Sequence, residues 1–428
     1  MAIAAAVASG NAGDVASEVK NLEVSGFGTP DAAIIFYSGA GTGANPNTLL
    51  TLGCGFFDGT NQASGAFTCQ HNVSTPNPTM RVTSSQMLTV PNNGAGRFVE
   101  CTAGWATDGL ALTVSFDATG LERFVDAILL KGLTNCVVGN ISPGGSSSGS
   151  VTGLGFTPNV VLAFATGNTS TDSTTYTTDA GLSFGVSRID GTSSYHHHCV
   201  VVGVEDAGSP TNTHTAVLTS KSVAYIDSAN DTMGWDCYFN NFTSGGFDWT
   251  ASTTISSLIF YLAIEAPNPD DFVSLVVDSA TSTGSSAQTG TGMTPDVLIT
   301  GQTMCASTDT VTAGMAVTLG AVDSSTAGCS FVSDADNLGT TSTSSRHETD
   351  AVHIRSDAAA LDAVASLTSF DSNGWTWNYS DAAASATKIF ALAIGDSTSV
   401  GGGPSVNWNG LTSYNWNGVT SFNWNGIT

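Results

Sequence analysis

The chain has 428 residues, a length that favours about three domains at roughly 150 residues each. Only 11% of the residues are charged and 48 are glycine, a composition that favours short strands and turns over long helices. The formal charge of −25 would repel a phosphate backbone, so we expect no nucleic-acid partner. No run of about 18 apolar residues occurs, so we expect no membrane span.

Three segments repeat one opening, in which glycines, a threonine and a proline precede an apolar run. The openings are GFGTPD at 26–31, GLGFTPN at 153–159 and GTGMTPD at 290–296. The runs that follow are AAIIFY, VVLAF and VLIT. Glycine and proline favour a turn, and a short β-prone apolar run is typical of a buried strand.

A second repeat follows each opening, at 49–59, 181–191 and 314–324, and ends in an Asp-Gly or Asp-Ser pair. Such pairs indicate a β-hairpin. A cysteine recurs after each hairpin at Cys69, Cys199 and Cys329.

The repeats also close alike, with a glycine turn at 108–113, 245–250 and 373–378 and a last apolar strand at 127–130, 261–264 and 391–394. If the first and last strands of a repeat pair in one sheet, the two ends of the repeat lie near each other. The sequence therefore predicts an all-β fold of three tandem antiparallel β-sandwich modules, jelly-roll-like, at residues 21–140, 151–277 and 288–396. Residues 1–20 are expected to form an N-terminal arm, and 141–150 and 278–288 flexible connectors.

The C-terminal segment 405–428 consists of three octads that each carry Trp-Asn-Gly. Asn-Gly favours a tight turn between strands, and the even period places the tryptophans on one side. So short a piece cannot bury three indoles alone, so we expect a β-repeat tail that mediates assembly; a disordered end is the alternative. The assembly residues are Trp408, Asn409, Gly410, Trp416, Asn417, Gly418, Trp424, Asn425 and Gly426.

Two motifs resemble functional sites, one a catalytic serine and the other a metal site. We expect that neither has that function here. Gly181–Gly185 matches the G-x-S-x-G nucleophile pattern, but the segment is expected to be a strand, and the equivalent position in the third repeat is Ala316. His196, His197 and His198 are residue types that bind metals, but alternate residues of a strand face opposite sides. We therefore predict no catalytic residue, no metal ligand and no enzyme.

Acidic loops at 227–231 and 334–337 could bind calcium through oxygen atoms, although neither has EF-hand spacing, so no cofactor is predicted. The cysteines leave two alternatives open. Each module could hold one disulfide, or the thiols could be free and buried as small hydrophobic side chains. The candidate pairs are Cys69 with Cys101, Cys199 with Cys237, and Cys305 with Cys329.

The module pattern resembles tandem domains in virion structural proteins of tailed bacteriophages. The likeness lies in the G-x-G-F-x-P-D/N opening, the hairpin segment and the closing glycine turn with its last strand, over about 370 residues. The tail is similar to short Asn-Gly repeats at the ends of such proteins. The resemblance implies a capsid decoration, tail or fibre component, made in the host cytoplasm and exposed on the particle surface.

Our leading hypothesis is thus a non-enzymatic virion protein that assembles through its tail, as a homotrimer, and contacts other virion proteins. An alternative is a carbohydrate-binding adhesin or receptor-binding protein that recognises a host-surface glycan. Its stacking platforms would come from Trp105, Trp235, Trp249, Trp375 or Trp377. A glycosidase would need two carboxylates facing each other in a cleft, and the sequence indicates no such pair.

Overall fold

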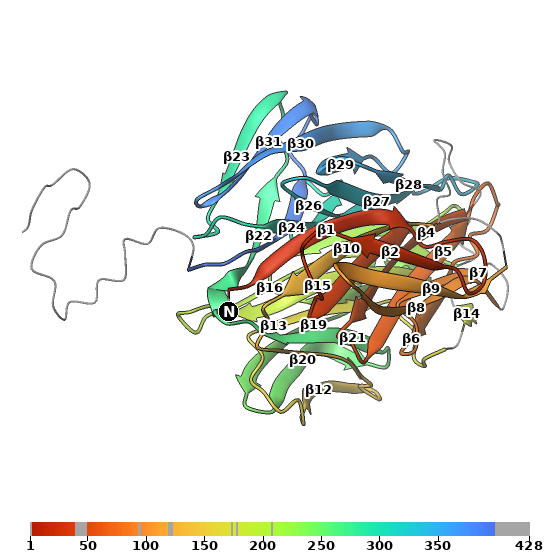
Figure 1. The fold of residues 1–428 in the computed structure, drawn as a ribbon. Coiled ribbons are helices and arrows are strands. Elements are labelled where there is room, and N and C mark those ends of the chain that lie inside the picture. The colour runs from red at the N-terminus through yellow and green to blue at the C-terminus, as the bar shows by residue number, and fades with distance from the viewer. Residues whose placement is uncertain are drawn as a thin grey trace, which may run out of the picture.

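The computed structural model describes residues 2–38, 49–92, 96–118, 123–172, 174–176, 179–206 and 209–398. Within these ranges the protein consists of thirty-two β-strands and two short 3₁₀ turns, η1 (Ser228–Asn230) and η2 (Pro269–Asp271), with no α-helix. All strand pairs are antiparallel. The predicted all-β sandwich fold is confirmed, as Figure 1 shows.

The first sandwich contains ten strands in two sheets. The larger sheet has the order β1-β10-β3-β4-β5-β6 and the smaller one β2-β9-β8-β7. The strands are β1 (Ala4–Asn11), β2 (Val19–Glu23), β3 (Ala32–Ser38), β4 (Leu49–Phe57), β5 (Gln62–Gln70), β6 (Thr79–Thr83), β7 (Leu88–Asn92), β8 (Gly96–Ala106), β9 (Gly109–Asp117) and β10 (Phe124–Lys131).

The second sandwich repeats this topology, with a larger sheet β11-β21-β13-β15-β16-β17 and a smaller sheet β12-β20-β19-β18. Its strands are β11 (Asn135–Ile141), β12 (Ser146–Val151), β13 (Val160–Ala165), β15 (Asp179–Ile189), β16 (Tyr195–Glu205), β17 (Thr213–Leu218), β18 (Val223–Asp227), β19 (Thr232–Thr243), β20 (Gly246–Ile255) and β21 (Ile259–Glu265).

The third sandwich has the same order again, β22-β32-β24-β26-β27-β28 and β23-β31-β30-β29. Its strands are β22 (Phe272–Asp278), β23 (Gly284–Thr289), β24 (Val297–Thr303), β26 (Met315–Asp323), β27 (Ala327–Asp334), β28 (Ser344–Glu348), β29 (Val352–Arg355), β30 (Leu361–Asp371), β31 (Gly374–Asp381) and β32 (Lys388–Ile394). Counted within a sandwich, the larger sheet is therefore always 1-10-3-4-5-6 and the smaller always 2-9-8-7.

The sequence repeats fall at equivalent strands of the three sandwiches. The apolar run after each opening is the third strand, and it pairs with the tenth. Cys69, Cys199 and Cys329 all lie in the fifth strand. The match between sequence and topology shows that the three sandwiches are copies of one unit.

Both faces of the third strand are buried, which explains why its sequence is apolar without alternation. In β3, Ala33, Ile35 and Tyr37 point into a core between the two sheets of the first sandwich. Ile34 and Phe36 point the other way, into a second core. That second core, here called the central core, contains side chains from the larger sheets of all three sandwiches. The cores between the paired sheets of each sandwich are called the outer cores, and that of the second sandwich comprises two clusters.

The structure corrects the expected boundaries of the modules. Residues 4–11 of the expected N-terminal arm form β1, which pairs with β10 along its whole length and places Val7 in the central core. The expected connectors also contain strands. β12 and β23 are the second strands of their sandwiches, where small polar residues suffice because the backbone pairs with β20 or β31 and one face is open to solvent.

Two short strands cross from one sandwich to its predecessor. β14 (Thr174–Tyr176) precedes β15 in the second sandwich but pairs with β6 of the first. β25 (Thr312–Ala313) precedes β26 in the third sandwich but pairs with β17 of the second. Each extends the larger sheet of the preceding sandwich at its sixth strand, so successive sandwiches are joined through their backbones.

Candidate functional site

The three sandwiches contact one another in a repeated, cyclic pattern. The fifth strand of each one contacts the first and fourth strands of the next: β5 contacts β11 and β15, β16 contacts β22 and β26, and β27 contacts β1 and β4. The last of these returns from the third sandwich to the first. The chain therefore forms a closed ring of three sandwiches, visible in Figure 1 as red-orange, yellow-green and teal-blue groups of strands that lie against one another.

Phenylalanine rings connect the sandwiches in the central core. Phe184 in β15 lies 4.9 Å from Phe36 and 6.4 Å from Phe56, both in the first sandwich. It also lies 6.4 Å from Phe390 in the third, all measured between ring centroids. These edge and tilted geometries are favourable for aromatic pairs. One fully buried side chain thus touches all three sandwiches.

The aspartates of the predicted hairpins hold the next sandwich at two of the three interfaces. Asp58 Oδ2 accepts a hydrogen bond of 2.8 Å from the backbone N–H of Val138 in β11. Asp323 Oδ2 accepts one of the same length from the N–H of Val7 in β1. Val7 and Val138 are equivalent, since they pair with Ile128 and Leu262 at the same position of the tenth strand.

The third hairpin aspartate behaves differently. Asp190 Oδ2 lies 2.9 Å from His196 Nε2, and its Oδ1 accepts from the backbone N–H groups of Thr192 and Ser194 within its own turn. The contact with the third sandwich is made instead by Asp270, whose Oδ1 accepts a hydrogen bond of 3.1 Å from the backbone N–H of Gly191. Burial alone would raise the pKa of Asp190. The hydrogen bonds that Asp190 receives from His196, Ser194 and Thr192 outweigh this effect and hold its pKa below its usual range.

A threonine before the sixth strand forms a second repeated contact. Thr211 accepts the N–H of Asn337 at its carbonyl and donates its own N–H to the carbonyl of Leu338. Thr341 makes the same pair of bonds with Asn72 and Val73 of the first sandwich. The threonine hydroxyls also match, because each donates to a carbonyl just before the asparagine, that of Ala335 at 2.8 Å or Gln70 at 2.7 Å.

The ring closes between the third and first sandwiches through a buried hydrogen bond between a histidine and an aspartate. His347 Nε2 lies 2.9 Å from Asp126 Oδ1, with both side chains almost inaccessible to solvent. Ser9 Oγ donates to the same carboxylate at 2.7 Å. The imidazole stacks on Phe124 at 4.8 Å between ring centroids. Residues 221 positions apart in the chain are joined here, which a linear array of sandwiches would not allow.

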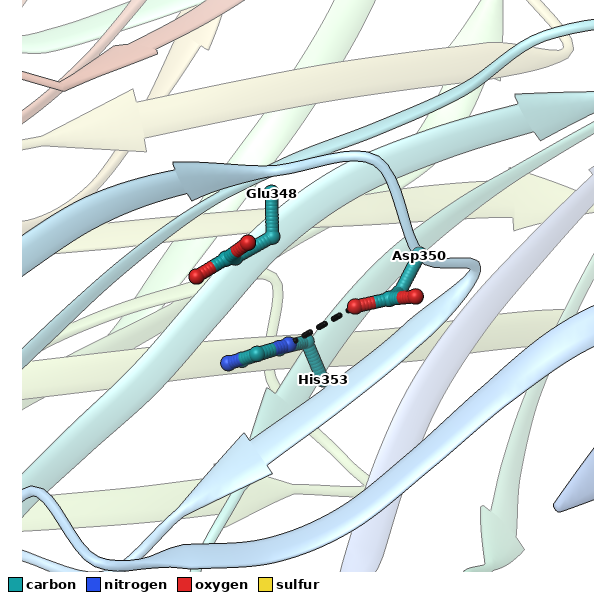
Figure 2. Close-up of side chains that lie close together, drawn as sticks. All are labelled: Glu348, Asp350 and His353. Atoms are coloured by element: carbon teal, nitrogen blue, oxygen red, sulfur yellow. Dashed lines mark hydrogen bonds and ion pairs between the residues drawn. The ribbon is translucent and has the colours of Figure 1, made fainter. Parts of the chain in front are cut away.

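One cluster of the described residues has the composition of a metal site. Glu348, Asp350 and His353 bring a carboxylate oxygen or ring nitrogen within 4.8 Å of one another, at the turn between β28 and β29. Figure 2 shows the hydrogen bond between His353 and Asp350, 3.0 Å long.

Neither nitrogen of His353 is open to a cation. Arg355 Nε donates to His353 Nε2 at 2.9 Å, so Nε2 is the acceptor and Nδ1 carries the proton given to Asp350. Glu348 pairs with Arg346 at 3.2 Å. Two guanidinium groups already supply positive charge, so the cluster is a hydrogen-bonded charge network and does not suit a metal.

The three consecutive histidines diverge, as the strand alternation predicts. His197 Nδ1 lies 2.8 Å from Ser187 Oγ, and His198 Nδ1 lies 2.9 Å from Ser274 Oγ on β22. Burial lowers the pKa of His197 and His198 to about 4, so both are neutral at pH 7. With His196 bound to Asp190, no shared ligand site forms among them.

The two acidic loops considered for calcium lie side by side at the interface between the second and third sandwiches. Asp231, Asp336 and Asn337 line one surface hollow. Asp336 Oδ1 already accepts from Thr213 N at 3.1 Å. Within the described part of the chain, the Glu348 cluster alone brings three acidic, histidine or cysteine ligand atoms within 4.8 Å of one another, so the carboxylates of these loops do not converge to that distance.

Ser183 has a structural role in the middle of β15. It is buried, and its hydroxyl accepts the backbone N–H of Ala224 at 3.0 Å. An activated serine needs an adjacent base and a sharp turn after the strand. The segment instead continues as an extended strand to Ile189, which excludes a nucleophile elbow.

All eight cysteines are free thiols, so none of the three candidate disulfides is formed. Seven are buried, six of them in strands and Cys305 in the segment after β24, and Cys136 is half-buried. Burial raises the pKa of every one, to about 12 for Cys101, Cys136 and Cys237. The thiols therefore act as small apolar side chains and are not nucleophiles.

Four of the five tryptophans considered as sugar platforms are core residues. Trp375 and Trp377 are fully buried in the outer core of the third sandwich, and Trp235 and Trp249 lie in that of the second. Trp105 is half-buried and lines a surface hollow. The octad residues predicted to mediate assembly lie outside the described residues.

The sequence patterns predict the hairpin aspartates only as turn residues. They give no indication of Thr211, Thr341 or His347.

No protein-family model matches the sequence. No curated protein matches it either. The described residues include no helix that is long and apolar enough to cross a membrane.

Proposed function

We propose that the chain is a non-enzymatic structural protein of a phage virion, acting as a capsid decoration, tail or fibre component. The observation that carries this proposal is the closed ring of three sandwiches, in which polar groups at the interfaces serve to hold neighbouring sandwiches together. Asp58, Asp323 and the Asp126–His347 pair all have this use. A closed ring with a shared buried core and buried thiols suits a protein that persists on a particle surface.

The chain's own symmetry supports a place at a threefold position. Three equivalent sandwiches in cyclic contact offer three similar surfaces to a partner, as a trimer of single-sandwich chains would. Other virion proteins arranged about a threefold axis are therefore the partners that the ring fits best. Host-cytoplasmic synthesis and exposure on the particle remain part of this proposal.

The octads at 405–428 are proposed to connect the ring to the particle or to other copies of the chain. The last described residue, Thr398, and Ala2 line one surface hollow, together with the segment that joins the second and third sandwiches. Self-assembly to a homotrimer stays a prediction. It is tested by light scattering on the full chain and on a chain ending at Thr398, and a monomeric full chain would contradict it.

The virion proposal is tested on particles. Antibodies raised against the folded ring should label purified tailed phage whose genome encodes this chain, and mass spectrometry of the same particles should detect it in a fixed copy number. A chain ending at Thr398 should fold but fail to incorporate. Absence of the protein from purified particles would overturn the proposal.

A further inference from the structure

A surface hollow of about 270 Å³ lies where the first sandwich meets the second. Its walls are the turn before β3, the hairpin after β4, the end of β8 and the segment that enters β11. The lining combines one aromatic ring, that of Trp105, with polar side chains from Asp31, Asp58, Thr134 and Asn135. Small-molecule sites commonly join an aromatic surface to a few convergent polar groups.

Contacts with Phe57 and Gly59 fix the position of the Trp105 ring. It packs on Phe57 with 4.6 Å between ring centroids. Gly59 lies against the other edge, and a Cβ there would stand 2.8 Å from the indole Nε1. Gly59 also has φ +89°, a conformation that favours glycine. Among the tryptophans of the described residues, Trp105 alone is not buried, so a fixed, partly exposed ring faces the solvent here.

The polar lining offers both acceptors and donors. Asp31 Oδ2 accepts from the N–H groups of Gly132 and Leu133, at 2.7 and 3.0 Å, and these bonds fix the carboxylate. Asp58 is fixed by its own turn and by Val138. Asn135 Nδ2 donates to Glu265 Oε2 at 2.5 Å, which leaves its Oδ1 as an acceptor. Thr134 adds a hydroxyl that can do either.

We propose that this hollow binds a neutral saccharide, with the sugar's C–H face on Trp105 and its hydroxyls hydrogen-bonded to the Asp31 carboxylate and the Thr134 and Asn135 side chains. The inference goes beyond the proposed structural role, which does not depend on it. Sugar hydroxyls donate and accept at once, and they need the mixed lining seen here. A cationic ligand would use only the acceptors, and both carboxylates already receive backbone N–H donors.

The other two sandwiches provide an internal comparison. Phe242 and Phe370 occupy the position of Trp105, because each stands four residues before the glycine that begins the ninth strand. Tyr195 packs edge-on against Phe242, with 5.3 Å between ring centroids. Phe370 lines a hollow in the third sandwich whose polar groups come from Asp323 and hydroxyl side chains, with no amide. The Trp105 hollow is thus distinct in its ring and its lining.

The test is saturation-transfer NMR on the full chain with glucose, galactose, N-acetylglucosamine and N-acetylgalactosamine at millimolar concentration, and with tetramethylammonium as a cationic probe. We expect transfer to at least one sugar. Trp105→Ala should weaken its binding at least about tenfold, the effect of losing a central aromatic contact. The matched variant Phe370→Ala should bind as the wild type does.

Asn135→Ala provides a second variant at an exposed residue, and we expect it to weaken the same sugar severalfold with an unchanged melting temperature. Three results would overturn the proposal: no transfer to any of the four sugars, sugar binding that Trp105→Ala leaves unchanged, or binding of tetramethylammonium in place of sugars that Trp105→Ala abolishes. Loss of sugar binding with the virion labelling intact would leave the structural role standing by itself.

Discussion

The central core and the outer cores differ in what they hold together. An outer core lies between two sheets of one sandwich and is filled by that sandwich alone, as with Trp375 and Trp377 in the third. The central core draws its side chains from three larger sheets and includes Phe36, Phe184 and Phe390. Outer cores therefore stabilise a sandwich, whereas the central core stabilises the ring. Truncating an outer-core side chain should consequently loosen one sandwich, whereas truncating an equally buried central-core side chain should loosen the contacts between sandwiches.

The largest expected effect comes from Phe184→Ala in the central core, compared with Phe247→Ala in the outer core of the second sandwich. Each should lower the free energy of unfolding by about 3–5 kcal/mol, the usual cost of a large core truncation. Hydrogen exchange should rise in β3 and β32 only for Phe184→Ala, because its neighbours lie in other sandwiches. Identical exchange patterns in the two variants would contradict the distinction.

Breaking the buried hydrogen bonds that close the ring should cost slightly less. Asp126→Ala leaves the buried His347 Nε2 and Ser9 Oγ without their acceptor and should lower the free energy of unfolding by about 3 kcal/mol. The control is Asp350→Ala: His353 is equally buried, but the Asp350 side chain is partly exposed, so water can replace the lost carboxylate and the cost should be about 1 kcal/mol. Urea denaturation of both variants measures the difference. Equal costs would mean that the closing interface contributes no more than a surface pair.

The hairpin aspartates allow a three-way comparison. Asp58→Ala and Asp323→Ala each remove an acceptor for the N–H of the next sandwich and should cost about 1–3 kcal/mol. Asp190→Ala loses bonds chiefly within its own turn and should cost about 1 kcal/mol. The melting temperatures of the three variants give the order of these costs. A ranking with Asp190 first would show that turn formation, and not contact between sandwiches, sets the effect.

One buried carboxyl in the third sandwich should make stability depend on pH. Asp334 is fully buried at the end of β27, and burial raises its pKa from 3.8 to about 7. The folded state therefore binds this proton more tightly than the unfolded state does. Its contribution to stability is complete below about pH 4 and is lost as the pH rises towards 7.

Asp334→Asn should consequently stabilise the protein by roughly 1–3 kcal/mol at pH 8 relative to wild type, with no gain at pH 4. Urea denaturation at the two pH values measures the difference. A constant difference between the two proteins across this range would show that Asp334 is ionised in the folded state.

The thiols should give the smallest effect. Because seven of the eight are buried and all are free, a reducing agent should leave the melting temperature unchanged. A thiol reagent should modify at most the half-buried Cys136 in the folded protein and all eight after denaturation. Fewer than eight reactive groups in the denatured, unreduced protein would reveal a disulfide.

The sandwiches themselves could be predicted because turn residues and apolar strands repeat at fixed positions. The closed ring could not be predicted, although the sequence contains one indication of it, the continuous apolar run of the third strand. In AAIIFY both alternating sets are apolar, and a strand of a sandwich with one solvent face would alternate. The continuous apolar run marked a second covered face, but it did not say that sister sandwiches cover it.

The misplaced boundaries have a different cause. The segment 146–151 (SSSGSV) has the composition of a linker, yet it forms β12, because an edge strand needs only backbone partners and small side chains. For the candidate site, the hairpin pattern located Asp58 and Asp323 but not their use, since Val138 and Val7 are brought to them by packing between sandwiches. His347 and Asp126 are likewise joined by ring closure alone.

Small-angle X-ray scattering tests the closed ring most directly. A chain ending at Thr398 should have a radius of gyration of about 21 Å, the value for a compact body of that length. Phe184→Ala should increase this radius if the ring opens. A wild-type radius well above about 21 Å, with the multiple-peaked distance distribution of three separate bodies in line, would contradict the ring.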